Sequence, residues 1–81
     1  MPSNKELVAI KKKLKQIWKS VLGVDEISNS TNFFDAGGTS RLLAELQVRV
    51  KEEFGFQPSL VELMTYSNIN SFSDFMNGRT M

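Results

Sequence analysis

Apolar side chains recur at helical spacing in the first quarter of the chain. They form one stripe, with steps of three and four residues: Leu7, Ile10, Leu14, Ile17, Trp18, Val21 and Leu22. This stripe predicts an amphipathic helix with one buried face. Ser3 and Glu6 have the spacing of a capping box at its start, and Gly23 is placed to end it. The lysines fall on the opposite face, where solvation is the preferred interpretation, although the run at 11–13 could also bind RNA or anionic lipid.

A long loop is predicted next, because no helical period survives from Gly23 to about Thr39. A loop of this length in a small domain is usually functional or carries structure of its own. Val24 and Ile27 are expected to anchor it to the core. At least one residue of the Phe33-Phe34 pair is expected to be buried, since two adjacent exposed phenylalanines would be costly. The alternative for this pair is a partner-docking patch.

The second predicted helix runs from Ser40 to Phe54. Its inner stripe consists of Leu42, Leu43, Leu46, Val50 and Phe54. On its outer side, charges of alternating sign recur every four residues and predict a solvent-facing ladder of weak ion pairs: Arg41, Glu45, Arg49 and Glu53. Because this ladder begins beside Ser40, it is also the surface that we expect a partner to recognise. Gly55 is placed to end the helix.

Two shorter helices are predicted in the remainder of the chain. Ser59 and Glu62 repeat the capping-box spacing, and the helix that follows has Leu60, Leu63 and Met64 as its apolar face. Ser67 or Asn68 is expected to cap the last helix, and Asn77-Gly78 to close it. Its apolar residues are Ile69, Phe72, Phe75 and Met76. No segment alternates with period two, so the sequence predicts an all-α domain, residues 1–81, in which four helices surround one core.

Composition narrows the chemistry that is possible. The chain of 81 residues contains no histidine and no cysteine, which removes disulfides, thiolate chemistry and the usual zinc ligands. Its carboxylates are too scattered for a calcium loop, so we expect no metal site. A net charge of +1 argues against nucleic acid as a partner. No apolar run is long enough to span a bilayer and no signal peptide is visible, so a cytoplasmic location without membrane contact is expected.

Ser40 is the residue that the sequence singles out. It follows Gly37-Gly38-Thr39 and opens the second predicted helix, so its hydroxyl is expected on an exposed corner with no bulky neighbours. The free N–H groups and the dipole of a helix N-terminus favour a phosphate there. Nothing in the sequence resembles a base that could activate this serine, so it is interpreted as an attachment point and not as a catalytic nucleophile. The alternative role is a helix N-cap.

The segment from Asn32 to Ser40, NFFDAGGTS, resembles the modification-site signature of peptidyl carrier proteins, the thiolation domains of nonribosomal peptide synthetases. These belong to the phosphopantetheine-binding family that also contains acyl carrier proteins. The segment from Phe54 to Met64 resembles the family's stretch between its second and third helices without gaps, and Ile69 occupies the apolar position that opens its last helix. The resemblance implies the small four-helix bundle of the acyl carrier protein type, with a short third helix and a long first loop.

The resemblance further implies a carrier and not an enzyme. Ser40 would receive 4′-phosphopantetheine covalently from coenzyme A, through a magnesium-dependent phosphopantetheinyl transferase, with Gly37, Gly38 and Thr39 as the presentation loop. The thiol of the arm would hold aminoacyl, peptidyl or acyl groups as thioesters. Partners would be an adenylation or acyl-loading enzyme and condensation, ketosynthase or thioesterase enzymes. The residues assigned to partner recognition are Arg41, Leu42, Glu45 and Arg49. A monomer is expected.

Three positions depart from the family's pattern. Thr39 stands where histidine, aspartate or asparagine is common, and Arg41 replaces an apolar residue that touches partner enzymes. Arg41 could pair with the phosphate or select an unusual partner surface. Pro58-Ser59 stands where leucine and proline are usual. Two other functions stay open: a polyketide or stand-alone acyl carrier, which the glycine pair disfavours, and an unmodified helical adaptor that binds partners through the exposed half of the second helix.

Overall fold

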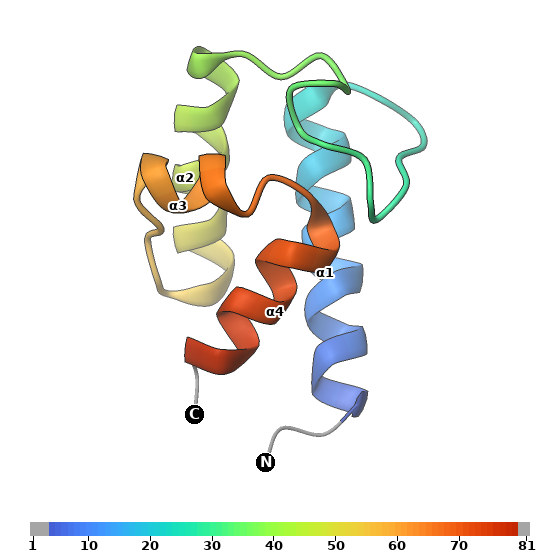
Figure 1. Cartoon of the computed structure of the whole chain (residues 1–81), viewed down its shortest axis with the longest axis vertical. Helices are drawn as coiled ribbons and strands as arrows, with labels where there is room; N and C mark the ends of the chain where they lie inside the picture. The colour runs from blue at the N-terminus through green and yellow to red at the C-terminus, as the bar shows by residue number, and fades with distance from the viewer. Residues whose placement is uncertain (1–3, 80–81) are drawn as a thin grey trace.

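The structure, a computed structural model, describes residues 4–79, and these contain helices and loops but no strand. The helices are α1 (Asn4–Leu22), α2 (Ser40–Phe54), α3 (Leu60–Thr65) and α4 (Ile69–Arg79) (Figure 1). The predicted all-α class, the short third helix and the long first loop are confirmed. No helix in this part of the chain is long and apolar enough to cross a membrane.

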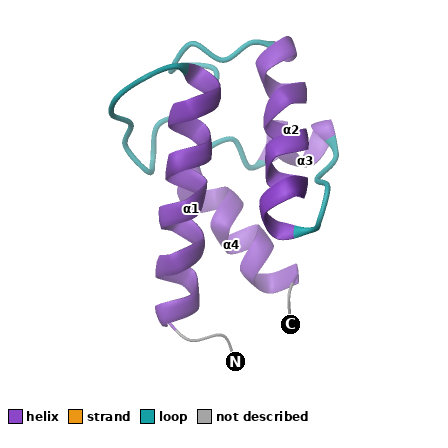
Figure 2. Cartoon of the chain, turned by 180° about the vertical axis from the view of Figure 1, so that it is seen from behind, coloured by secondary structure: helices purple, strands orange, loops and turns teal. Residues whose placement is uncertain are grey.

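Two long helices form the frame of the domain. α1 and α2 lie side by side and run in opposite directions, so the end of α1 and the start of α2 share one end of the molecule (Figures 1 and 2). α4 packs obliquely against α1, and α3 packs on α2. The loop between α1 and α2 lies at the end where Ser40 begins its helix.

Trp18 lies at the centre of the core and is fully buried. Its ring meets Phe33 edge-on at a centroid distance of 5.9 Å and contacts Phe72 at 5.8 Å. The predicted stripes supply most of the other buried side chains: Leu14, Ile17, Val21, Leu43, Leu46, Val50, Leu63, Ile69 and Met76. Each large apolar side chain buried in this way contributes about 1.5–3 kcal/mol, so this single cluster holds the helices together.

Most helix ends lie where the sequence predicts them. Gly23 and Gly55 follow α1 and α2 with φ values of 70° and 75°, and each donates its N–H to a carbonyl of the preceding turn. The capping box of Ser59 and Glu62 is present at α3. Of the box predicted for α1, Ser3 lies outside the described residues. Asn68 caps α4, since its Oδ1 accepts a hydrogen bond of 2.7 Å from the Ser71 N–H.

The predicted stop at Asn77-Gly78 is wrong. α4 continues through both residues to Arg79, and Gly78 is not among the glycines with positive φ. An Asn-Gly pair ends a helix when its backbone turns to the left-handed region. Here the backbone keeps its helical conformation, so the stop signal is not used.

The predicted apolar face of α3 is also wrong in part. Leu63 is buried, but Leu60 and Met64 are 44% and 57% exposed. α3 has six residues, fewer than two turns, and lies on the surface of α2. A helix this short buries one position deeply and leaves its neighbours in solvent.

Candidate functional site

The loop between α1 and α2 is anchored by apolar side chains at both ends. Ile27 is buried, and Val24 packs against the core. Phe33 is fully buried, whereas Phe34 is 37% exposed and lies edge-on to the Phe33 ring. The prediction that at least one phenylalanine is a core anchor is confirmed. The loop is therefore an ordered part of the domain and fixes the position of the segment that leads to Ser40.

Asn32 ties this loop to the connection between α3 and α4. Its Oδ1 accepts a hydrogen bond of 2.8 Å from the Phe34 N–H, and its Nδ2 donates one of 2.6 Å to Ser67 Oγ. The Ser67 carbonyl also accepts the Phe33 N–H at 2.7 Å. Our sequence reasoning missed this link. The signal was an asparagine directly before a turn, where its side chain commonly bonds the backbone two residues further on.

Gly37 and Gly38 are required for two different reasons. Gly37 has a φ of 102°, which side chains rarely tolerate, but open space surrounds the place of a Cβ. Gly38 has ordinary φ, but a Cβ there would lie 2.3 Å from Phe33 Cδ2 and 2.7 Å from the Phe33 carbonyl oxygen. The Gly38 N–H donates to that carbonyl at 3.0 Å. The glycine pair thus lets the chain turn and pass directly over the buried phenylalanine.

Thr39, and not Ser40, is the N-cap of α2. Thr39 has extended backbone angles, and its Oγ1 accepts a hydrogen bond of 3.2 Å from the Leu42 N–H. Ser40 is the first helical residue and is exposed. Its hydroxyl forms no hydrogen bond within residues 4–79. The alternative that Ser40 serves as the cap is therefore wrong, and its hydroxyl is free for other chemistry.

The start of α2 offers an anion-binding environment beside that hydroxyl. The backbone N–H groups of Ser40 and Arg41 donate to no acceptor in the described part of the chain. The first turn of α2 carries no acidic residue. Free N–H groups and the positive end of the helix dipole both stabilise a phosphate at this position. The described residues contain no cluster of acidic side chains that could hold a metal ion.

The four residues predicted for partner recognition do not share one exposed face. Arg41 and Glu45 are exposed, and their side chains form no ion pair or hydrogen bond among residues 4–79. Leu42 packs against the core. Arg49 donates from Nη2 to Ser20 Oγ at 3.0 Å on α1.

The predicted ladder of ion pairs on α2 is accordingly wrong. Besides Arg49, Glu53 also binds α1, through an ion pair with Lys13. Two of the four charges link α2 to α1 across their seam instead of pairing with the next turn of α2. Arg41 and Glu45 remain as the charges near Ser40.

The sequence also matches a known protein family. Residues 12–76 match the family described as "Phosphopantetheine attachment site". The chain is 33% identical to polyketide synthase PksN of Bacillus subtilis over 75 residues, which are 93% of this chain and 1% of that protein. It is 36% identical to bacitracin synthase 3 of Bacillus licheniformis over 64 residues, 79% of this chain and 1% of the synthase. The chain thus spans about one hundredth of the length of these two relatives.

Solved structures agree on the fold. The peptidyl carrier protein in a complex with the phosphopantetheine transferase Sfp and coenzyme A is 29% identical, with a TM-score of 0.83 and coverage of 96% of each chain. BlmI, a type-II acyl carrier protein from Streptomyces verticillus, has a TM-score of 0.90 at 21% identity, covering 95% of this chain and 93% of BlmI, and shares the fold. The chain therefore belongs to the family of phosphopantetheine attachment domains, and it has the four-helix fold of acyl and peptidyl carrier proteins.

Proposed function

We propose that Ser40 is the residue to which 4′-phosphopantetheine is attached, and that the chain works as a carrier without catalytic activity of its own. The observation that supports this proposal is that Thr39 and Ser40 have separate roles at the start of α2. Thr39 supplies the cap, so the neighbouring Ser40 hydroxyl is exposed and unbonded. The side-chain-free turn at Gly37 and Gly38 leaves room for a partner's active site to approach.

The residues present fit the phosphopantetheine group. In the attachment step, Ser40 Oγ forms a bond to the phosphorus that bears the pantetheine in coenzyme A, the bond from that phosphorus to adenosine bisphosphate breaks, and the hydroxyl proton passes to the transferase. No carboxylate or amine of residues 4–79 hydrogen-bonds to the Ser40 hydroxyl, so we assign the base to the transferase. The N–H groups of Ser40 and Arg41 would stabilise the phosphodiester charge. When bound, the group supplies a thiol that holds an acyl group as a thioester.

For the cargo, we propose aminoacyl or peptidyl groups, loaded by an adenylation enzyme and passed to a condensation or thioesterase enzyme. The glycine pair before Ser40 favours this type. Similarity to PksN keeps a polyketide intermediate, handled by a ketosynthase, as the second candidate. Loading assays separate the two: an adenylation enzyme with ATP and amino acids should acylate the modified chain, and an acyltransferase with malonyl-coenzyme A should not.

We propose that a partner enzyme recognises the charged side chains of Arg41 and Glu45 next to Ser40. Both are exposed on the first two turns of α2. Leu42 and Arg49 would act on recognition mainly by fixing α2 in place, since Leu42 packs on the core and Arg49 binds Ser20. In the adaptor alternative, the same surface binds partners while Ser40 stays unmodified.

The deciding experiment is intact-mass measurement after incubation with coenzyme A, magnesium and a broad-specificity phosphopantetheinyl transferase. The wild type should gain one phosphopantetheine and Ser40→Ala none. Ser30→Ala, which alters an exposed serine of the preceding loop, should be modified like the wild type. A folded wild-type chain that stays unmodified while a known carrier reacts in the same tube would favour the adaptor. A mass gain in Ser40→Ala would place the attachment elsewhere.

A further inference from the structure

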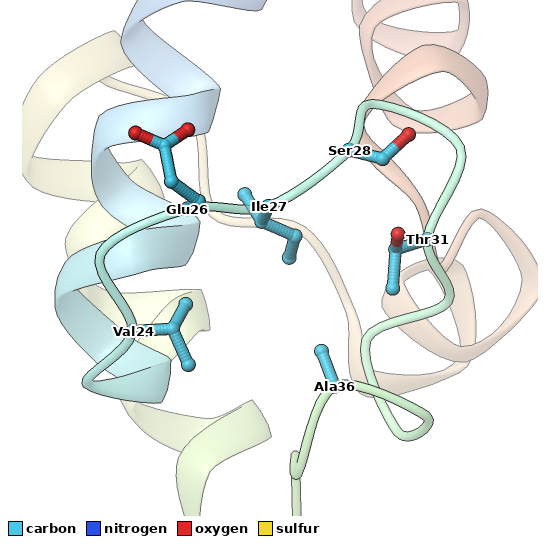
Figure 3. Close-up of a pocket in the computed structure, with 6 residues that line it drawn as sticks. All are labelled: Val24, Glu26, Ile27, Ser28, Thr31 and Ala36. Carbon is cyan, nitrogen blue, oxygen red and sulfur yellow. The ribbon is translucent and has the colours of Figure 1, made fainter.

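The loop between α1 and α2 borders an open surface cleft at the end of the molecule where α2 begins. Its volume is about 510 Å³, within the range of small-molecule sites. Six residues line it: Val24, Glu26, Ile27, Ser28, Thr31 and Ala36. Figure 3 shows the side chains of Val24, Ile27 and Ala36 pointing into a common space, whereas the Glu26 carboxylate points away from it. The cleft therefore has an apolar floor, and Ser28 and Thr31 place hydroxyls at its edge.

The cleft is within reach of a group that is tethered to Ser40. Ala36 precedes Ser40 by four residues, which span at most about 14 Å even when fully extended. Only Gly37, Gly38 and Thr39 lie between, so few side chains obstruct the path. Two further clefts lie along the seam of α1 and α2 and are lined by Lys13 and Glu53. Glu53 is at the far end of α2, about 20 Å from Ser40 at the rise of a helix.

The lining suits one chemistry in particular. A pantetheine arm carries geminal methyl groups and short methylene segments, separated by two amides, and its chain is longer than four residues of backbone. The apolar floor would receive the methyl groups, and a hydroxyl at the edge would bond an amide. The Thr31 hydroxyl is available for this, because it has no hydrogen-bond partner among residues 4–79. Ser28 Oγ, in contrast, pairs with Ser30 Oγ at 3.0 Å.

We propose that this cleft binds the pantetheine arm when no partner enzyme holds it. This inference rests on the proposed function, since it requires the arm on Ser40. A weak contact is sufficient, because the tether gives the arm a local concentration in the millimolar range. The arm then exchanges between the cleft and solvent. A partner that takes up the thioester withdraws the arm from the cleft.

The test uses the modified chain itself. Protein labelled with ¹³C and ¹⁵N is modified with unlabelled coenzyme A, and its intact mass shows that the arm is attached. An isotope-filtered NOE spectrum should then contain cross-peaks from the arm's geminal methyls to the Val24 and Ile27 methyls. The amide signals of residues 24–31 should also shift between the unmodified and modified forms. These readouts require no enzymatic activity of the loaded chain.

Two matched variants assign the effect to the cleft. Ala36→Leu fills the cleft and should abolish the cross-peaks and the loop shifts. Ala9→Leu makes the same change on an exposed position of α1 and should preserve both. A modified wild type without arm-to-loop cross-peaks, with shifts confined to the neighbours of Ser40, would overturn this inference and leave the carrier function standing. Failure to attach the arm would instead contradict the proposed function. If Ala36→Leu does not fold, the wild-type cross-peaks alone decide.

Discussion

Gly38 lies directly against the Phe33 ring, and replacing it with alanine should be severely disruptive. The new Cβ would lie 2.3 and 2.4 Å from two carbons of the Phe33 ring and 2.7 Å from the Phe33 carbonyl oxygen. Carbon atoms in contact prefer about 3.5–4.0 Å, so the ring would have to move by more than about 1 Å, and the carbonyl oxygen by a smaller distance. Phe33 cannot move freely, because it is fully buried against Trp18 and its N–H is bonded to the Ser67 carbonyl.

The cost of this change follows from overpacking in a closely packed core. Such substitutions typically lower the free energy of unfolding by about 1–3 kcal/mol. Gly38→Ala should lie at the upper end of this range, because the new Cβ would clash with the Phe33 backbone as well as its side chain. For a domain of this size each kcal/mol lowers Tm by about 4–8 °C, so we expect a fall of about 10–20 °C. Relief by displacing the loop would also move Ser40 and slow its modification by the transferase.

Thermal unfolding followed by circular dichroism measures the first effect, and the rate of mass gain with the transferase measures the second. Gly78→Ala is the matched control. It makes the same substitution in α4, where no atom lies within 4 Å of the added Cβ, and should raise the stability by up to about 0.5–1 kcal/mol. An unchanged Tm together with an unchanged modification rate in Gly38→Ala would refute the argument that this glycine is fixed by the Phe33 ring.

Three other substitutions test separate parts of the site. Thr39→Ala removes the cap of α2 and should cost about 1 kcal/mol in urea unfolding, with Thr39→Ser close to the wild type; equal stability of all three would contradict the cap assignment. Asn32→Asp keeps the acceptor for the Phe34 N–H but loses the amide group that donates to Ser67 Oγ, so it should destabilise the domain by about 1–3 kcal/mol. A Tm equal to that of the wild type would show that the Asn32–Ser67 hydrogen bond is unimportant for stability. Arg41→Leu should leave stability within about 0.5 kcal/mol and change reaction rates with cognate partners, whereas a less cooperative unfolding transition would place Arg41 in the structure.

The long helices and their buried stripes could be predicted from the sequence because each pattern extends over several turns. Trp18, Leu14 and Leu46 are buried as the periodicity requires. The glycines after α1 and α2 also gave reliable ends, since both adopt the left-handed conformation for which glycine is suited. In these segments local preference and tertiary packing favour the same structure.

The errors fall where a local pattern permits two outcomes. Thr39 and Ser40 are both good caps, and local preference does not choose between them; in the structure Thr39 takes the role. Leu60 and Met64 look apolar enough to be buried, but a short helix on the surface has no second layer to cover them. The link from Asn32 to Ser67 joins residues 35 positions apart, which no periodicity can reveal.

That link has a consequence for the order in which the domain can be completed during synthesis. The partners of the loop lie late in the chain: the Ser67 carbonyl holds Phe33, and the Asn29 carbonyl accepts the Asn70 N–H at 3.0 Å. Phe72 supplies one side of the Trp18 pocket in the core. A nascent chain that ends after α2 therefore contains Ser40 but lacks the contacts that hold the turn in front of it. The contacts that fix the turn in front of Ser40 are therefore complete only once α4 has packed, which couples the geometry of the serine to the last helix of the domain.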